Sequence, residues 1–541
     1  MRIRRGSAIA ASVTVFFGLT VIPAAAEDPK LAAFTKQQVS WAPCDGGPPP
    51  PGFPPEEWEK LWAGLECATL TVPMDYRNPD DGRLSIAVSR RKAKNPAKRQ
   101  GVLLLNPGGP GGDGLLMPSY LTGEAIADSF DLIGFDPRGV GRSTELRCEA
   151  GHWEPARTRP TDDQFPVIAA AKLSQEQACQ RAGGGLRPFI STANTARDMD
   201  VIRAALGEKK INYLGFSYGT YLGAVYGSLF PRNLNRSVLD SSMHPDWLYY
   251  EQSKQQAVAA RQNFDAWAAW VAERDKTYHL GTSVAQVTAT LDALGKQLAV
   301  TPVPWPEHPE YGKIDRNLFD MILGYETVSR PGWALTTELI LKIKAAVGGT
   351  LSPDAAKALA ALTKYSIPET FNGVFPTVTC EADWPADLNV YYEQMRIFRE
   401  RYPYGRGAGA AEPTECTFRS FTPPERITDL KRNGYPTGLV VQAEFDPSTQ
   451  YDGGPAMAAK LNNSLISIAD EGAHGLYGRN DCATKKINEY LIDGVLPGSR
   501  VTCPGAPRPN VPVDGLATQS SRSLEERALE LIKTQKLDRG F

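Results

Sequence analysis

Apolar and polar residues alternate along the first half of the chain in a way that predicts strands. Residues 68–73 and 83–90 alternate with a period of two, which is typical of strands that bury one face. Residues 101–105 and 131–135 are short apolar runs that end in glycine-rich turns. Such runs are typical of a mostly parallel sheet that is covered on both faces. The pattern therefore predicts a sheet whose central strands are fully buried.

Helical spacing of apolar residues follows between the later strands. A helix is predicted over residues 194–206, where Asn194 can cap the first turn. A strand at 211–214, a helix at 221–229 and a strand at 236–240 come next. Strands that alternate with helices in this way indicate an α/β protein.

A long, mainly helical segment then interrupts the alternation. Helices are expected within it at 263–273, 333–346 and 353–362, and strands return afterwards at 438–443 and 465–469. The chain therefore divides into a sheet-forming core in two parts with an insertion between them. The predicted parts are the first part of the core (27–242), a helical cap insertion (243–433), the second part of the core (434–505) and a tail with a charged helix (506–541).

The first 26 residues have the pattern of a secretory signal peptide. Arg2, Arg4 and Arg5 precede an uncharged, mostly apolar run over Ala8–Ile22, and small residues lead to Glu27. The alternative is a single membrane anchor, but the apolar run of about 15 residues is shorter than the roughly 20 that span a bilayer. We therefore expect cleavage before Glu27, a secreted, extracellular protein and no membrane anchor in the mature form.

Composition excludes several classes of function. The chain of 541 residues is 42% hydrophobic and 22% charged, which is typical of a packed globular protein. Its formal net charge of −2 leaves no basic excess to hold nucleic acid. The histidines are far apart and no cysteine pair has ligand spacing, so no metal site is expected.

A glycine-flanked serine gives the first chemical signal. Gly215–Gly219 has the pattern G-x-S-x-G and lies between a predicted strand and a predicted helix. A serine on such a turn is held with its hydroxyl exposed, and the glycines admit the strained backbone. Ser217 is therefore the candidate nucleophile.

A serine nucleophile needs a base, and the base needs an acid that orients it. In proteins with this turn, the order along the chain is serine, acid, histidine. His474 stands in a glycine-flanked loop after the last predicted strand, and Asp446 follows the strand before it. Glu444 is the rival acid, but Asp446 sits further into the turn. The candidate catalytic residues are therefore Ser217, Asp446 and His474.

The glycine-rich loop Asn106–Gly112 follows a buried strand and can stabilise an oxyanion. Pro110 has no N–H, so the expected backbone donors are Gly109 and Tyr218. Gly109–Gly114 also matches G-x-G-x-x-G, the dinucleotide fingerprint. This stretch does not open a βαβ unit, and an exported protein rarely meets a nicotinamide cofactor, so no cofactor is expected. The alternative for all three loops is a set of tight turns without chemistry, against which their correct order argues.

Four longer motifs show a resemblance to a known family. They are Asn106–Gly112, Gly134–Gly141, Asn194–Asp198 and Leu214–Thr220. Together they resemble the secreted tripeptidyl aminopeptidases of actinobacteria, which are α/β-hydrolase serine peptidases related to prolyl aminopeptidases. The resemblance runs from about Trp41 to Cys503 and implies an α/β-hydrolase fold, with helices on both faces of a mostly parallel sheet and a large cap. It also implies the same triad. Pro107 stands where prolyl aminopeptidases usually have histidine, which favours the tripeptidyl branch.

The resemblance implies a serine exopeptidase that releases short peptides, expected to be tripeptides, through an acyl-enzyme. Its expected partners are peptides or proteins with free N-termini. Glu381 and Asp383 are candidates to bind the substrate α-ammonium, and the alternative is that they are solvated surface acids. Two other functions stay open: a secreted carboxylesterase with the same triad and a non-catalytic hydrolase-like binding protein.

The chain has eight cysteines, which allow 105 pairings. Export places them in an oxidising compartment, where disulfides are expected. Their grouping favours pairing between neighbours, with loops of about 20 to 36 residues worth roughly 3 to 4 kcal/mol each in the chain-entropy model. The expected pairs are Cys44–Cys67, Cys148–Cys179, Cys380–Cys416 and Cys482–Cys503.

Overall fold

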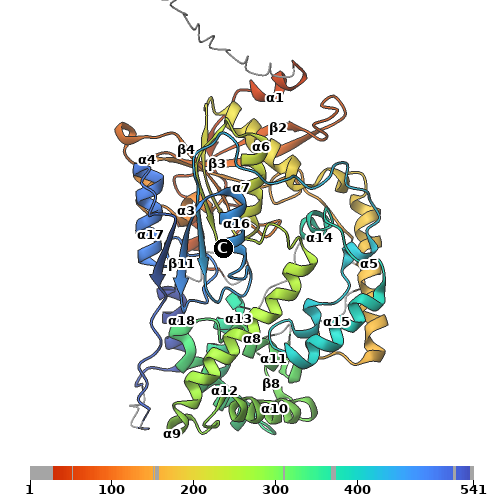
Figure 1. The fold of residues 1–541 in the computed structure, drawn as a ribbon, viewed down its shortest axis with the longest axis vertical. Coiled ribbons are helices and arrows are strands. Elements are labelled where there is room, and N and C mark those ends of the chain that lie inside the picture. Colours follow the sequence, from red (N-terminus) through yellow and green to blue (C-terminus); the bar gives the residue numbers. More distant parts are fainter. Residues whose placement is uncertain are drawn as a thin grey trace, which may run out of the picture.

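The described residues form one ten-stranded sheet with a separate layer of helices beside it (Figure 1). The computed structural model describes residues 29–50, 53–149, 151–152, 157–306, 308, 311–366, 373–513, 515 and 520–535. The predicted signal peptide over residues 1–26 lies outside these ranges.

The sheet is antiparallel at one edge and parallel over the rest. The strand order is β1-β2-β3-β5-β4-β6-β7-β10-β11-β12. The bounds are β1 (Ala42–Pro43), β2 (Glu66–Pro73), β3 (Arg83–Arg91), β4 (Val102–Asn106), β5 (Asp131–Phe135), β6 (Ile211–Phe216), β7 (Leu234–Asp240), β10 (Leu439–Ala443), β11 (Ser464–Ala469) and β12 (Arg500–Pro504). Every pairing from β5 to β12 is parallel, which confirms the predicted mostly parallel sheet. The sequence did not predict β12, because this edge strand has no apolar run.

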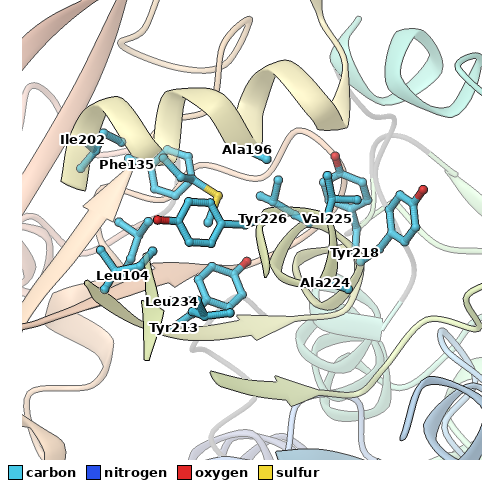
Figure 2. Packing of buried hydrophobic residues seen from close by; sticks show 14 of the residues in the cluster. Leu104, Phe135, Ala196, Ile202, Tyr213, Tyr218, Ala224, Val225, Tyr226 and Leu234 are labelled. Carbon is cyan, nitrogen blue, oxygen red and sulfur yellow. The ribbon is translucent and has the colours of Figure 1, made fainter. Parts of the chain in front are cut away.

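Helices cover both faces of the parallel strands. On β4, Val102 and Leu104 pack into one core, whereas Leu103 and Leu105 pack into the other. The first core, part of which is seen in Figure 2, includes side chains of α6 (Thr192–Ala205), α7 (Tyr218–Leu229) and α16 (Gly453–Leu461). The second includes side chains of α3 (Met117–Tyr120), α4 (Ile126–Ser129) and α17 (Asp481–Asn488). The alternation of apolar side chains along a strand therefore serves two cores.

The helix expected from Asn194 begins two residues earlier. Ser191 is the N-cap of α6, and its hydroxyl accepts a hydrogen bond from the Asn194 N–H at 3.2 Å. The prediction that Asn194 caps this helix was therefore wrong. Its amide instead donates to the Phe189 carbonyl and accepts from Arg197.

The helical layer has a hydrophobic core of its own, in which Trp267, Trp270, Trp305 and Trp333 are fully buried. Its helices within residues 243–433 are α8 (Tyr250–Ala272), α9 (Asp275–Tyr278), α10 (Val284–Val300), α11 (Arg316–Tyr325), α12 (Trp333–Ala345), α13 (Pro353–Ser366), α14 (Val374–Thr379) and α15 (Leu388–Arg401). The same range contains the short strand pair β8 (Val303–Pro304) and β9 (Lys313–Ile314), and the first part of the chain contains the short helices α1 (Ala32–Thr35) and α2 (Pro55–Trp62). Among all the described helices, none has the length and apolar character needed to cross a membrane.

Two helices from outside the predicted insertion join this layer. α5 (Phe165–Gly183), which lies between β5 and β6 in the chain, packs Phe165 and Ile168 against Met395 and Phe398 of α15. α18 (Leu524–Thr534), the charged helix of the tail, packs against α12 and α13. The layer beside the sheet is therefore built from three separate segments of the chain.

Four disulfides join neighbouring cysteines. They are Cys44–Cys67, Cys148–Cys179, Cys380–Cys416 and Cys482–Cys503. These are the pairs that the grouping along the sequence favours. The third pair closes a loop that contains Glu381 and Asp383.

Candidate active site

The turns after four parallel strands meet at one cavity. Parallel strands bring their carboxyl ends to the same edge of a sheet, and the turns that follow β4, β6, β10 and β11 all contribute to its wall. The cavity has a volume of about 2440 Å³ and lies between this edge and the helical layer. Gly109, Ser217, Thr449 and His474 all line it. The structure therefore brings the sequence-predicted turns together.

Ser217 occupies a strained backbone conformation between β6 and α7. Its φ is 56° and its ψ is −127°, values that only a tightly held turn imposes on a residue with a side chain. The Ser217 N–H donates to the Asp240 carbonyl at 3.0 Å, which fixes the turn to the neighbouring strand. A Cβ on Gly215 would lie 2.5 Å from the Gly219 carbonyl, so the turn requires glycine there. The half-buried Ser217 side chain faces the cavity from this position.

Asp446 and His474 form a close pair behind the cavity wall. His474 Nδ1 lies 2.9 Å from Asp446 Oδ2 and 3.1 Å from Oδ1. The Asp446 carboxylate is fully buried, and its Oδ1 also accepts the backbone N–H groups of Ser448 and Thr449 at 2.8 and 2.9 Å. The Thr449 hydroxyl lies 3.0 Å from Oδ2. Several donors therefore hold the carboxylate in one orientation against the imidazole.

A second buried acid, Asp240, holds the loop that carries His474. Its carboxylate accepts the N–H groups of Leu476 at 3.1 Å and Tyr477 at 2.7 Å. Next to it, the Ser241 hydroxyl accepts the Gly475 N–H at 2.8 Å. Burial raises the pKa of Asp240 to about 6. This role is not predictable from the sequence, in which Asp240 is only an aspartate at the end of a predicted strand.

The glycine-rich loop lies directly against the serine turn. A Cβ on Gly108, whose φ is 99°, would lie 2.5 Å from the Phe216 carbonyl and 2.9 Å from Ser217 Cβ. The Gly108 N–H is already donated to the Asn106 side chain at 3.0 Å, whereas Gly109 lines the cavity. Tyr218 is the first residue of α7, and N–H groups in the first turn of a helix have no acceptor within that helix.

Glu381 lies close to the serine turn, and Asp383 does not share its environment. The Glu381 carboxylate accepts the Thr192 N–H at 2.9 Å, the Thr192 hydroxyl at 2.5 Å and the Tyr249 hydroxyl at 3.1 Å. The same Thr192 hydroxyl lies 2.7 Å from the Tyr218 hydroxyl. Burial raises the pKa of Glu381, and no lysine or arginine within the described ranges forms an ion pair with it. Asp383 is exposed, so its surroundings are those of a solvated surface acid.

Within the part of the chain that the structure describes, no three histidine, cysteine, aspartate or glutamate side chains are arranged to hold a metal ion. The cavity wall carries Ser217 and His474 together with acidic and basic side chains, among them Glu412 and Arg187.

The chain is similar to known hydrolases. Residues 101–312 match the family model described as alpha/beta hydrolase fold, and residues 402–503 match the one described as TAP-like protein. The tripeptidyl aminopeptidase of Streptomyces lividans is 34% identical over 469 residues, which cover 82% of this chain and 85% of that protein.

Two mycobacterial proteins are also similar along most of the chain. The serine protease Hip1 of Mycobacterium tuberculosis is 27% identical over 499 residues, which cover 88% of this chain and 92% of that protein. Carboxylesterase B of the same species is 30% identical over 512 residues, with 90% of this chain and 94% of that protein covered. The matches confirm the predicted α/β-hydrolase fold.

Proposed function

Because the chain belongs to the tripeptidyl aminopeptidase family of α/β-hydrolases, we propose that it is a secreted serine exopeptidase that releases tripeptides from free N-termini. The observation that carries the proposal is the pairing of buried Asp446 with His474, which lines the same cavity as Ser217. The similarity to a tripeptidyl aminopeptidase and to a serine protease supports a serine peptidase. The release of tripeptides in particular is proposed from the tripeptidyl aminopeptidase relative.

The proposed reaction follows the chemistry of a serine triad. Ser217 Oγ attacks the substrate carbonyl carbon while His474 accepts the hydroxyl proton at Nε2, because its Nδ1 faces Asp446. His474 then gives this proton to the leaving amine, and the short peptide remains esterified to Ser217. A water molecule, deprotonated by the same histidine, hydrolyses the ester and frees the product.

The backbone N–H groups of Gly109 and Tyr218 are the proposed oxyanion donors. Gly109 lines the cavity beside Ser217, and the Tyr218 N–H belongs to the unpaired first turn of α7. Each such donor contributes roughly 3 kcal/mol to stabilisation of the transition state. Asp446 stabilises the imidazolium that forms during the attack.

Glu381 is the proposed anchor for the α-ammonium of the substrate. It is a half-buried carboxylate whose hydrogen-bond donors, Thr192 and Tyr249, are neutral, so the α-ammonium of a substrate would supply the cation that balances its charge. Tyr249, which donates to it, and Thr379 and Trp384, which lie close to it in the chain, line the cavity. A charge-assisted hydrogen bond of this type contributes about 1.5 to 3 kcal/mol. Asp383, which is exposed, is not included in the proposed anchor.

Export is supported by the disulfides and by the sequence of the first 26 residues. Four disulfides are typical of proteins that fold in an oxidising compartment. The proposed protein is therefore extracellular, with peptides or proteins that have free N-termini as its partners.

The decisive experiment compares products and substrates. The purified protein should release tripeptides from peptides of known N-terminus, as read by mass spectrometry, and the Ser217→Ala variant should release none. N-acetylation of the substrate should abolish release, and Glu381→Gln should raise KM for the free amine by about 10-fold or more. Equal turnover of free and acetylated peptides would argue against an aminopeptidase.

The second candidate is a secreted carboxylesterase with the same triad. The similarity to carboxylesterase B over 90% of the chain favours it. Turnover of a tripeptidyl nitroanilide and of a short acyl ester by the same preparation separates the two functions. Turnover of the ester alone, lost in Ser217→Ala, would establish the esterase.

A further inference from the structure

Arg330 is a fully buried arginine at the junction between the helical layer and the sheet. It precedes α12 in the chain and has no exposed surface, although its side chain carries a positive charge. Buried guanidinium groups are unfavourable unless their donors are paired. The partners of Arg330 therefore show what this residue does in the fold.

One set of partners leads to the loop that carries Asp446. Arg330 Nη1 donates to Asn263 Oδ1 at 2.5 Å, and Asn263 Nδ2 donates to the Phe445 carbonyl at 2.8 Å. The guanidinium also lies over the Phe445 ring, 4.5 Å from its centroid. Phe445 is the residue directly before Asp446. Two residues of the helical layer thus hold both the backbone and the ring next to the proposed orienting acid.

The other set of partners leads to the loop that carries His474. Arg330 Nε donates to Asp470 Oδ1 at 3.3 Å. A Cβ on Gly472 would lie 2.6 Å from Arg330 Nη1 and 2.3 Å from the Val328 carbonyl, so the layer packs directly on this backbone. Gly472 is two residues before His474. The same guanidinium therefore contacts both loops of the Asp446–His474 pair.

The two loops are also joined to each other at this point. The Phe445 N–H donates to the Glu471 carbonyl at 2.8 Å, and Glu471 Oε1 accepts the N–H groups of Gly472 and Ala473 at 2.8 and 2.9 Å. A shift of Arg330 would therefore move a connected unit that includes the residues before Asp446 and before His474. Displacements of about 1 Å at a catalytic group can lower a rate about 10²-fold.

We propose that Arg330, with Asn263, is a positioning residue through which the helical layer aligns Asp446 and His474 for proton transfer. The proposal rests on the proposed function of Ser217, Asp446 and His474. It differs from a role in folding alone, because Arg330 contacts both loops of the triad in addition to Val328 and Trp333 of its own layer. Rates of serine acylation should therefore depend on Arg330 in protein that remains folded.

The test measures how fast a fluorophosphonate probe labels Ser217 between pH 5 and 9, together with kcat and KM for a tripeptidyl nitroanilide and a short ester. Arg330→Gln removes the charge, the Nε donor to Asp470 and the contact of the guanidinium with the Phe445 ring. Arg527→Gln is the matched control, because Arg527 also belongs to the helical layer and pairs with Glu338 at 2.6 and 2.9 Å, away from the triad loops. Melting temperatures show that each variant is folded at the assay temperature.

We expect Arg330→Gln to label at least about 10-fold more slowly at pH 7, with kcat reduced and KM within about two-fold of the wild type. The dependence of labelling on pH should also change, because Arg330 contacts the loops that carry Asp446 and His474. Arg527→Gln should label within about two-fold of the wild type even where it melts earlier. Asn263→Ser, which affects mainly the acid loop, carries the same expectations if Arg330→Gln does not fold.

Two results separate failure of this proposal from failure of the proposed function. If the probe labels Ser217→Ala at the wild-type rate, Ser217 is not the nucleophile and the proposed function fails, whatever the Arg330 variant does. Loss of labelling in Ser217→Ala, together with an unchanged rate and pH profile in folded Arg330→Gln, would leave the function in place and overturn the positioning role.

Discussion

Replacing Asp446 by asparagine tests the proposed triad with a minimal change of shape. In the wild type, Asp446 Oδ1 accepts the N–H groups of Ser448 and Thr449, while Oδ2 lies 2.9 Å from His474 Nδ1. In Asp446→Asn, the amide oxygen must take the place of Oδ1, because both N–H groups need an acceptor. The NH₂ group then occupies the place of Oδ2 and points its donors at the imidazole.

This change forces the imidazole into the wrong tautomer. A donor opposite His474 Nδ1 requires that nitrogen to be unprotonated, so Nε2 carries the hydrogen and cannot accept a proton from Ser217. Loss of the orienting acid in this way lowers kcat about 10⁴-fold, which corresponds to about 5 kcal/mol of transition-state stabilisation. The fold should survive, because the Thr449 hydroxyl can accept from the new amide while it donates to the Ser241 carbonyl, 2.9 Å away.

The assay is kcat/KM for a tripeptidyl nitroanilide, read together with the melting temperature. Glu444→Gln is the control, since Glu444 is an exposed acid on the same loop and its carboxylate accepts the Asp470 N–H at 2.8 Å. It should keep kcat/KM within about three-fold, or about 0.7 kcal/mol. A folded Asp446→Asn protein with more than about one-tenth of wild-type activity would refute the assignment of Asp446.

Three further predictions concern stability. Replacing Cys380 and Cys416 together by serine opens a loop with a sequence separation of 36 residues and should lower the free energy of unfolding by about 4 kcal/mol in the chain-entropy model, as measured by denaturant titration; an unchanged midpoint would contradict it. Gly108→Ala should destabilise by about 2 kcal/mol or more, because its φ is 99° and the new Cβ would lie 2.5 Å from a backbone carbonyl; Gly123→Ala, where no atom lies within 4 Å, is the thermal-melt control. Burial raises the pKa of Asp240 to about 6, above its unfolded value of about 3.9. Protonated Asp240 therefore stabilises the fold by on the order of 3 kcal/mol below about pH 4, and this contribution is lost as the pH rises to about 6. Melts of Asp240→Asn from pH 4 to 7 should lack this decline, and a slope equal to that of the wild type would count against the prediction.

Local patterns in the sequence were enough to predict the strands and the turns that carry chemistry. Ser217, Asp446 and His474 each follow a short apolar strand, and the parallel sheet brings such strand ends together regardless of how far apart they are in the chain. A turn is encoded by the few residues in it, so glycine spacing and strand period suffice to find it.

The contacts between distant segments were not predictable in the same way. Nothing near Arg330 in the sequence indicates that its guanidinium reaches Asn263 and Asp470. Asp240 likewise reads as the last residue of a strand, although its carboxylate holds the loop after His474. Both roles depend on how the helical layer and the final loop dock, which no local pattern specifies.

Two of the motifs that carried the family resemblance have a structural role in the fold. Arg138, from the second motif, is fully buried and forms two hydrogen bonds with Asp198, from the third, at 2.6 and 2.7 Å. The Tyr76 hydroxyl adds a third bond to the same carboxylate at 2.8 Å. Removing one partner of such a buried pair is strongly destabilising. A motif can therefore identify a family through residues that do no chemistry.

The helix α18 is synthesised after all three proposed triad residues, although it covers an apolar face of the helical layer. All three proposed triad residues precede residue 475, whereas the helix that packs on α12 and α13 begins only at Leu524. A nascent chain that has just produced His474 therefore still exposes Leu335, Leu339 and Leu362, which α18 covers in the finished protein. A stop codon between these two points would leave an apolar face open to water, with the triad residues all present. Synthesis of α18, which comes later than that of His474, therefore covers this face of the helical layer.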